Sequence, residues 1–113
     1  MSDLKNMSCT QPKKGDPQIS TADIEKFYAQ IPEWEIVEVE GINQLSRQFD
    51  FPNFVTALEF TNKVGNLAEA EDHHPSILTE WGKVTVTWWT HVVKGLHLND
   101  FIAAAKTDQI YIS

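Results

Sequence analysis

The 113-residue sequence lacks several features that would assign it to common classes of protein. Its only cysteine, Cys9, has no partner for an internal disulfide, which is typical of proteins in a reducing compartment. No apolar run approaches the roughly 20 residues that a membrane span requires, and the N-terminus lacks the apolar stretch of a secretory signal. We therefore expect a cytoplasmic protein that does not associate with a membrane.

Basic residues are also scarce. The chain has 9 Lys and Arg residues against 16 Asp and Glu residues, which gives a formal net charge of −7. A protein that binds a nucleic acid duplex needs a stripe of basic side chains to replace the counterions of the phosphates, and the sequence has no such stripe. We expect no direct binding of nucleic acid.

The length and composition fit one folded domain. Hydrophobic residues make up 42% of the chain and charged residues 22%, which is ordinary for a soluble globular protein. The first 19 residues are polar and show no periodicity. We therefore expect residues 1–19 to form a flexible leader and residues 20–113 to form a single domain.

Three segments have the apolar spacing of helices. After a cap at Ser20 or Thr21, apolar residues recur with helical spacing until Pro32 ends the segment. A longer helix is expected after Asn53, with a buried face made of Phe54, Ala57, Leu58, Thr61, Val64 and Ala68. A last helix is expected over about residues 98–106.

Four further segments have the alternation or residue types of strands, and they cover residues 34–39, 44–51, 77–81 and 84–91. Gly41 begins the turn between the first two, and residues 82–83 form the turn between the last two, so each pair predicts a hairpin. The order α-β-β-α-β-β-α predicts an α+β domain with a four-stranded antiparallel sheet and helices on one face. Trp88 and Trp89 point to opposite faces of the last strand, which leaves aromatic surface for subunit association.

The residues best suited to chemistry gather in the stretch EAEDHHP, residues 69–75, where two of the 4 histidines are adjacent. A hairpin places the end of one strand beside the start of its partner, so we expect His91 to lie near His73 and His74. Glu69 and Asp72 accompany them. Histidine titrates near neutral pH, so this cluster can donate and accept protons.

The residues alone leave three interpretations of this cluster open. The histidines could cap the preceding helix and pack around Pro75. Three histidines and a carboxylate could hold zinc, although the sequence lacks the His-x-x-x-His spacing and the cysteine pair typical of zinc sites. The cluster could instead perform acid–base catalysis without a metal or a covalent nucleophile. The remaining histidine, His97, is expected to be a surface or helix-capping residue.

The spacing of these residues resembles the signature of the pterin-4a-carbinolamine dehydratases. The stretch EAEDHHP is followed after five residues by Trp81, after nine more by His91 and after eight more by Asp100. The resemblance covers residues 31 to about 108. Two stretches, TEWGKVTVTWWTH and KGLHLNDF, are similar to the bacterial branch of the family that is associated with phenylalanine hydroxylase. His97 stands where the family more often has a small capping residue.

The resemblance implies an enzyme that removes water from a 4a-hydroxytetrahydropterin to give quinonoid dihydropterin, which recycles the cofactor of aromatic amino-acid hydroxylases. It implies a pterin as the substrate and a homodimer or homotetramer. Because the sequence has no recognised spacing of metal ligands, we expect no metal or cofactor. Members of the family also act as dimerisation cofactors of a homeodomain transcription factor in animals, so a protein-binding function of the same fold is the alternative. The complete signature favours the enzyme.

The resemblance also implies roles for individual residues. His73, His74 and His91 are the implied catalytic residues, with His74 and His91 as the proton-transfer pair and His73 mainly as a ligand of the pterin hydroxyl. The residues implied to orient these imidazoles or to shape and border the substrate pocket are Glu69, Asp72, Pro75, Thr90, Trp34 and Asp100. Trp34 is equally expected in the core, and Asp100 falls in the first turn of the last helix, where an acid suits the helix dipole.

Overall fold

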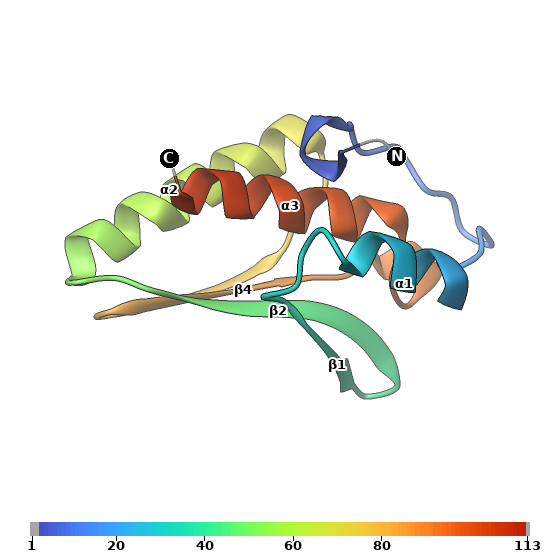
Figure 1. Ribbon diagram of the computed structural model, residues 1–113, viewed down its shortest axis with the longest axis horizontal. Helices are drawn as coiled ribbons and strands as arrows, with labels where there is room; N and C mark the ends of the chain where they lie inside the picture. Colours follow the sequence, from blue (N-terminus) through green and yellow to red (C-terminus); the bar gives the residue numbers. More distant parts are fainter. Residues whose placement is uncertain (1–2, 113) are drawn as a thin grey trace.

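The computed structural model describes residues 3–112, in which α-helices cover one face of a four-stranded antiparallel sheet (Figure 1). The predicted α+β class and the predicted order of helices and strands are confirmed. The elements are η1 (Leu4–Asn6), α1 (Thr21–Tyr28), β1 (Glu35–Val39), β2 (Ile42–Asp50), α2 (Phe54–Glu71), β3 (Ser76–Glu80), β4 (Lys83–Trp88), η2 (His91–Val93) and α3 (Leu98–Ile112), where η marks a 3-10 helix. Across the sheet the strands follow the order β1-β2-β4-β3.

Both hairpins turn over two residues. Glu40 and Gly41 connect β1 to β2 with φ angles of 52° and 81°, the left-handed conformation that suits a tight turn between twisted strands. Trp81 and Gly82 connect β3 to β4, one residue earlier than predicted, because Lys83 already pairs with Glu80. The two hairpins join where β2 pairs with β4.

The last strand is shorter than predicted, and His91 lies outside it. After β4 ends at Trp88, the backbones of Thr90 and Gly95 exchange two hydrogen bonds with N–O distances of 2.9 and 3.4 Å. These bonds close a short loop that contains η2, and Lys94 supplies the left-handed residue of the loop, with φ of 54°. His91 therefore begins a turn of 3-10 helix beyond the end of the strand.

The helix α2 buries only part of the predicted face, because Ala57, Val64 and Ala68 are buried and Phe54 and Leu58 are not. Its buried residues are Ala57, Phe60, Val64 and Ala68. Phe54 and Leu58, which were expected to be buried, are 44% and 43% exposed. Phe60, which the predicted face lacks, packs against Phe49 with ring centroids 4.8 Å apart. Apolar residues occur on two sides of this helix, so the spacing alone does not decide which of them are buried.

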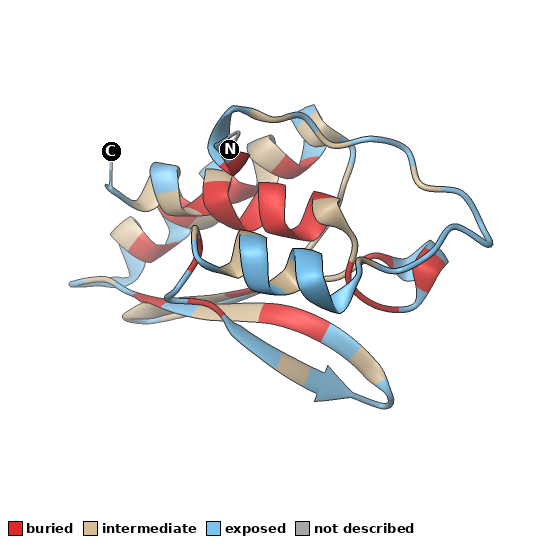
Figure 2. Cartoon of the chain, turned by 45° about the vertical axis from the view of Figure 1, so that its right-hand side comes forward, coloured by how far each residue is buried: buried red, intermediate tan, exposed pale blue. Residues whose placement is uncertain are grey.

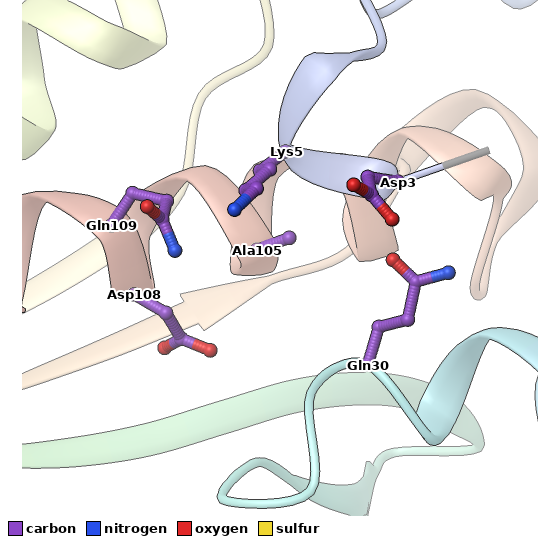
Figure 3. Close-up of a pocket in the computed structure, with 6 residues that line it drawn as sticks. All are labelled: Asp3, Lys5, Gln30, Ala105, Asp108 and Gln109. Carbon is purple, nitrogen blue, oxygen red and sulfur yellow. The ribbon is translucent and has the colours of Figure 1, made fainter.

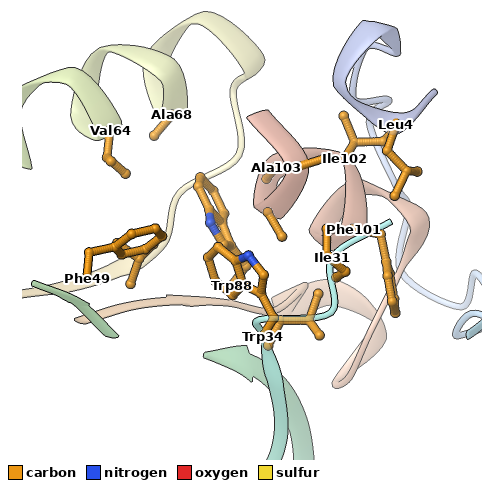
Figure 4. Close-up of a cluster of buried hydrophobic side chains, with 14 of the residues drawn as sticks. Leu4, Ile31, Trp34, Phe49, Val64, Ala68, Trp88, Phe101, Ile102 and Ala103 are labelled. Carbon is orange, nitrogen blue, oxygen red and sulfur yellow. The ribbon is translucent and has the colours of Figure 1, made fainter. Parts of the chain in front are cut away.

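The helix α3 forms the centre of the core and extends beyond the predicted end at residue 106. Figure 4 shows its Phe101, Ile102 and Ala103 among side chains from the sheet and from the other helices. The extension is stabilised by Tyr111, whose ring contacts Phe49 at 4.9 Å and whose hydroxyl donates to the backbone oxygen of Asp50. In Figure 2 the buried positions, in red, are concentrated along α3, and further buried positions lie in the sheet that it covers. None of the described helices is long and apolar enough to cross a membrane.

Trp34 lies in this core. Its side chain is fully buried, and its indole N–H donates to Asp108 at 2.8 Å. The same carboxylate oxygen accepts from Arg47 at 2.7 Å. Burial raises the pKa of Asp108, while the bonds from Trp34 and Arg47 act against that rise. Of the two expectations for Trp34, the structure supports the core residue.

The segment before α1 makes defined contacts with the domain. Leu4 is fully buried among the core residues, and its backbone N–H donates to the side chain of Gln30 at 2.8 Å. Ser20 then caps α1 by accepting from the backbone N–H of Asp23 at 3.2 Å. The flexibility of residues 1–19 stays a prediction, but the described part of this leader contributes a side chain to the core.

The contact between Trp34 and Asp108 generates a prediction about stability. Trp34→Phe keeps an aromatic ring in the core but removes the N–H donor of a half-buried carboxylate, so the free energy of unfolding should fall by about 1–3 kcal/mol. Urea denaturation followed by circular dichroism measures this loss. A variant with unchanged stability but weakened binding of a small ligand would contradict the assignment of Trp34 to the core.

Candidate functional site

The end of α2 delivers the two adjacent histidines. Asp72 ends the helix in the left-handed conformation, with φ of 51°, which Asp adopts more readily than most residues. The backbone N–H of His73 then donates to the carbonyl oxygen of Ala68 at 3.1 Å, which satisfies one of the last carbonyls of the helix. This reversal sends the two imidazoles to different surroundings before β3 begins.

His73 points inward. Its side chain is 10% exposed, and its Nε2 lies 2.6 Å from Oδ1 of Asp100, which is fully buried. The imidazole also stacks on the ring of Trp88, with centroids 5.4 Å apart and planes 19° apart. A hydrogen bond at one end and an aromatic face along one side hold this ring in a single orientation.

Asp100 links three elements through its carboxylate. Besides the bond from His73 on Oδ1, its Oδ2 accepts from the hydroxyl of Thr90 at 2.8 Å and from the backbone N–H of His97 at 2.9 Å. His97 is a helix-capping residue, since its Nδ1 accepts from the backbone N–H of Asn99 at 3.0 Å. The first turn of α3 is therefore built around the carboxylate that positions His73.

The donors around Asp100 determine the tautomer of His73. A carboxylate is only an acceptor when ionised, and this one already accepts from two other donors. The proton in the contact with Asp100 therefore belongs to Nε2 of His73. In the neutral imidazole this leaves Nδ1 as a hydrogen-bond acceptor.

His74 is in a more open position. Its Nε2 lies 2.5 Å from Oε2 of Glu69, and the two side chains are 56% and 77% exposed. Glu69 lies in the last turn of α2, so the helix that delivers His74 also supplies its carboxylate partner. Glu69 thus contacts an imidazole as the sequence predicts.

His91 approaches from the loop after β4. It is exposed, and its ring lies 4.9 Å from that of Trp89, centroid to centroid, with the planes 52° apart. His91 borders two hollows. One has a volume of about 210 Å³ and contains the other two histidines, and one of about 450 Å³ lies beside Trp89 and the start of β2.

The smaller hollow is where the predicted residues meet. Its lining consists of Gln11, Pro12, Asp72, His73, His74, Thr90, His91 and Val92. A separate hollow between η1 and α3, lined by Asp3, Lys5, Gln30, Ala105, Asp108 and Gln109, contains no histidine (Figure 3). The histidine-lined hollow, called the histidine pocket below, is the candidate site.

Comparisons with known proteins identify the family. The family model described as "Pterin 4 alpha carbinolamine dehydratase" matches residues 17–110. The chain belongs to this family. Two relatives named "Putative pterin-4-alpha-carbinolamine dehydratase" are similar over 110 residues. The one from Nitrosococcus oceani is 54% identical, with 97% of each chain covered, and the one from Syntrophotalea carbinolica is 52% identical, with 97% and 98% covered.

A solved structure has the same fold. It is the transcriptional coactivator/pterin dehydratase from Brucella melitensis, which superposes with a TM-score of 0.74 at 28% identity and covers 83% of this chain and 98% of its own. The resemblance inferred from the histidine signature is therefore confirmed at the level of the family and of the fold.

The structure separates the residues implied by the dehydratase signature into three groups. His73, His74, His91, Thr90 and Asp72 line the histidine pocket. Asp100 contacts His73 from the buried side, and Glu69 contacts His74 at the exposed rim. Pro75 follows the pocket residues without lining the pocket, and Trp34 lies in the core.

Asp72 has a different partner from the one implied. Its Oδ2 accepts from Nε2 of Gln11 at 3.1 Å, so it contacts the leader instead of an imidazole. The carboxylate that orients His73 is Asp100, which is 27 residues away in sequence. Asp100 therefore has two effects: it positions an imidazole, and its negative charge at the start of α3 interacts favourably with the helix dipole.

Gln11, Pro12 and Val92 line the pocket although the sequence gives no indication of it. Gln11 and Pro12 belong to the polar leader, which has no periodicity, and both precede residue 17, where the match of the family model begins. Their position depends on side-chain contacts with residues about sixty or more positions later, such as the contact of Gln11 with Asp72 over 61 positions. No local pattern encodes such contacts.

Within residues 3–112, no three or more His, Cys, Asp or Glu side chains are grouped in a way that could hold a metal ion. The imidazoles of His73 and His74 instead each contact one carboxylate. The arrangement offers proton donors and acceptors at the rim of an open pocket, which is suited to acid–base chemistry on a small polar substrate.

Proposed function

We propose that the chain is a 4a-hydroxytetrahydropterin dehydratase. The observation that supports this most strongly is the convergence of His73, His74 and His91 on one pocket, two of them in contact with a carboxylate, in a chain of the pterin-4-alpha-carbinolamine dehydratase family. The substrate is a tetrahydropterin that carries a hydroxyl at C4a. The product is quinonoid dihydropterin, which a reductase can return to tetrahydropterin.

The reaction needs one acid and one base. The C4a–O bond breaks and the leaving hydroxide takes a proton to become water. N5 loses its proton, and the electron pair of that N–H bond forms the C4a=N5 double bond. No oxidant, reductant or metal is required, and positioned acid and base groups typically supply about 10² to 10⁴ in rate.

The surroundings of the histidines suggest how the roles are divided. His74 and His91 are exposed at the rim of the pocket, where they can exchange protons with substrate and solvent, and we assign them as the proton-transfer pair. His73 is fixed by Asp100 and Trp88, and its Nδ1 is the available acceptor, so it binds the C4a hydroxyl and holds the substrate in place.

Substitution of the histidines tests this division. His74→Ala and His91→Ala should each lower kcat by about 10² or more, because each removes a proton-transfer group. His73→Ala should mainly raise KM. The measurement is the decay of 4a-hydroxytetrahydropterin in stopped-flow absorbance, corrected for the uncatalysed reaction and repeated with a chelator, which should have no effect.

His97→Asn is the matched control, since Asn also caps helices and the position lies outside the pocket. It should keep the activity of the parent chain. Full activity in the double variant His74→Ala, His91→Ala, with an unchanged circular dichroism spectrum, would refute the acid–base mechanism.

We also propose that the protein works as a homodimer or homotetramer in the cytoplasm, as a partner of a phenylalanine hydroxylase. The sequence suggested that Trp88 and Trp89 provide the surface for assembly, but Trp88 is a core residue and only Trp89 of the two is partly exposed. The surface that favours association is the outer side of α2, where Phe54, Val55 and Leu58 are 44%, 64% and 43% exposed.

Assembly through α2 has a direct test. Light scattering at micromolar concentration should give the mass of a dimer or a tetramer, and Leu58→Glu should reduce that mass because it places a charge in an apolar contact. Gln48→Glu, which adds the same charge at an exposed position of β2, is the control. A monomer for the unmodified chain would contradict the proposal.

The alternative function is that of a protein-binding module, because the Brucella melitensis protein is named a transcriptional coactivator as well as a pterin dehydratase. A module of this kind would use the apolar side of α2 and would tolerate the loss of the pocket histidines. The carboxylates that contact His73 and His74 favour the enzyme, since they orient imidazoles and add nothing to an apolar docking surface.

A further inference from the structure

The leader is attached to the rim of the histidine pocket by consecutive residues. The backbone N–H of Cys9 donates to Oε1 of Glu71 at 2.8 Å, and the side chain of Gln11 donates to Asp72 at 3.1 Å. Glu71 and Asp72 are the residues directly before His73. The leader is therefore fixed to the same helix end that delivers the pocket histidines.

Between these two attachments, Thr10 is held by Asn99. The backbone N–H of Thr10 donates to Oδ1 of Asn99 and the side-chain N–H of Asn99 donates to the carbonyl oxygen of Thr10, both at 2.9 Å. Asn99 is 1% exposed, so its amide satisfies both of its polar atoms through this exchange. Its neighbour Asp100 holds His73, so one turn of α3 positions both the leader and an imidazole.

The leader is also attached on the far side of the pocket. The side chain of Gln18 donates to the carbonyl oxygens of Val93 and Lys94 at 3.2 and 3.3 Å, and the backbone N–H of Ile19 donates to Leu96 at 2.9 Å. These partners belong to the loop that follows His91. In Figure 1 the N-terminal coil lies at the end of the molecule where α3 begins, which agrees with these contacts.

The part of the leader between the two sets of attachments borders the pocket, and we propose that it is a wall of the substrate site in which Gln11 contacts the pterin. Gln11 and Pro12 line the pocket together with the three histidines. This inference rests on the proposed dehydratase function. It extends the site to residues 9–12, which the family model does not match.

The chemistry of the two side chains suits this role. The amide of Gln11 can both donate and accept hydrogen bonds, as the amide-like edge of a pterin ring requires. Pro12 adds a rigid apolar surface that loses little conformational entropy when a flat ring packs on it. The contact with Asp72 holds Gln11 at the rim before the substrate arrives.

Three variants of the full chain test the proposal. Gln11→Ala should raise KM about two- to tenfold with kcat unchanged, which is the loss expected for one hydrogen bond made equally in the ground and transition states. Thr10→Pro removes the backbone N–H that donates to Oδ1 of Asn99. It should therefore detach the wall and raise KM at least as much as Gln11→Ala does. Ser8→Ala, an exposed change in the same segment, should match the unmodified chain.

Cys9 reports on the wall without any substrate. Partial burial and the neighbouring Glu71 raise the pKa of its thiol to about 12, so alkylation by iodoacetamide at about pH 8 should be slow in the unmodified chain. Thr10→Pro should speed the alkylation, because the detached segment exposes the thiol. Gln11→Ala should leave it slow, which separates loss of a substrate contact from loss of the attachment.

The outcomes separate this proposal from the dehydratase function. If KM is unchanged in Gln11→Ala, or in a Thr10→Pro variant whose Cys9 is alkylated faster, the proposal that the leader is a wall of the substrate site is wrong. The proposed dehydratase function is not affected by that result. If the unmodified chain lacks activity but binds 7,8-dihydrobiopterin in calorimetry, the proposed dehydratase function is wrong. The wall is then tested by the affinities of the variants for this probe, which should fall in Gln11→Ala and in Thr10→Pro. Absence of both activity and binding overturns both.

Discussion

The fully buried carboxylate of Asp100 is the interaction on which the site depends. A carboxylate without partners in the core would cost several kcal/mol, and the three donors from His73, Thr90 and His97 offset that cost. These donors come from the end of α2, the end of the sheet and the start of α3. The carboxylate of Asp100 thus fixes how these three parts of the chain meet, and it orients the imidazole of His73 as a result.

This constraint explains why the pocket lies where it does. The three histidines of the pocket come from the reversal after α2 and from the loop after β4, where the backbone leaves regular structure and side chains can be presented to solvent. The rigid parts are directly behind them, with Trp88 under His73 and the capped start of α3 around Asp100. The ring of His73, the most buried of the three histidines, is therefore held both by a hydrogen bond and by an aromatic face.

The sequence predicts much of the fold and part of the site. The alternating strands and the helical spacing were sufficient for the architecture, and the signature from Glu69 to Asp100 was sufficient for the histidines. The buried face of α2 was predicted only in part, because both sides of that helix carry apolar residues and only the packing of Phe60 against the sheet decides between them. The place of His91 after β4 depends on the backbone closure between Thr90 and Gly95, which no residue pattern reveals.

The contributions of distant residues were not predictable. Asp72 adjoins the histidines in sequence and yet bonds to the leader, whereas Asp100 bonds to His73 from another helix. Gln11 reaches the pocket only because Asn99 and Glu71 hold its neighbours. Each of these facts depends on a long-range side-chain contact, and such contacts follow from the completed packing of the domain.

The tautomer of His73 is the most direct test of the account. In the unmodified chain at about pH 8, where free histidine is neutral, nitrogen NMR should find the His73 proton on Nε2, facing Asp100. In Asp100→Asn the amide oxygen should take the place of Oδ2, which accepts from Thr90 and His97, and the NH₂ group should then face His73 and move its proton to Nδ1. A proton on Nδ1 in the unmodified chain, or an unchanged tautomer in Asp100→Asn, would contradict the claim that the buried carboxylate sets the state of the site.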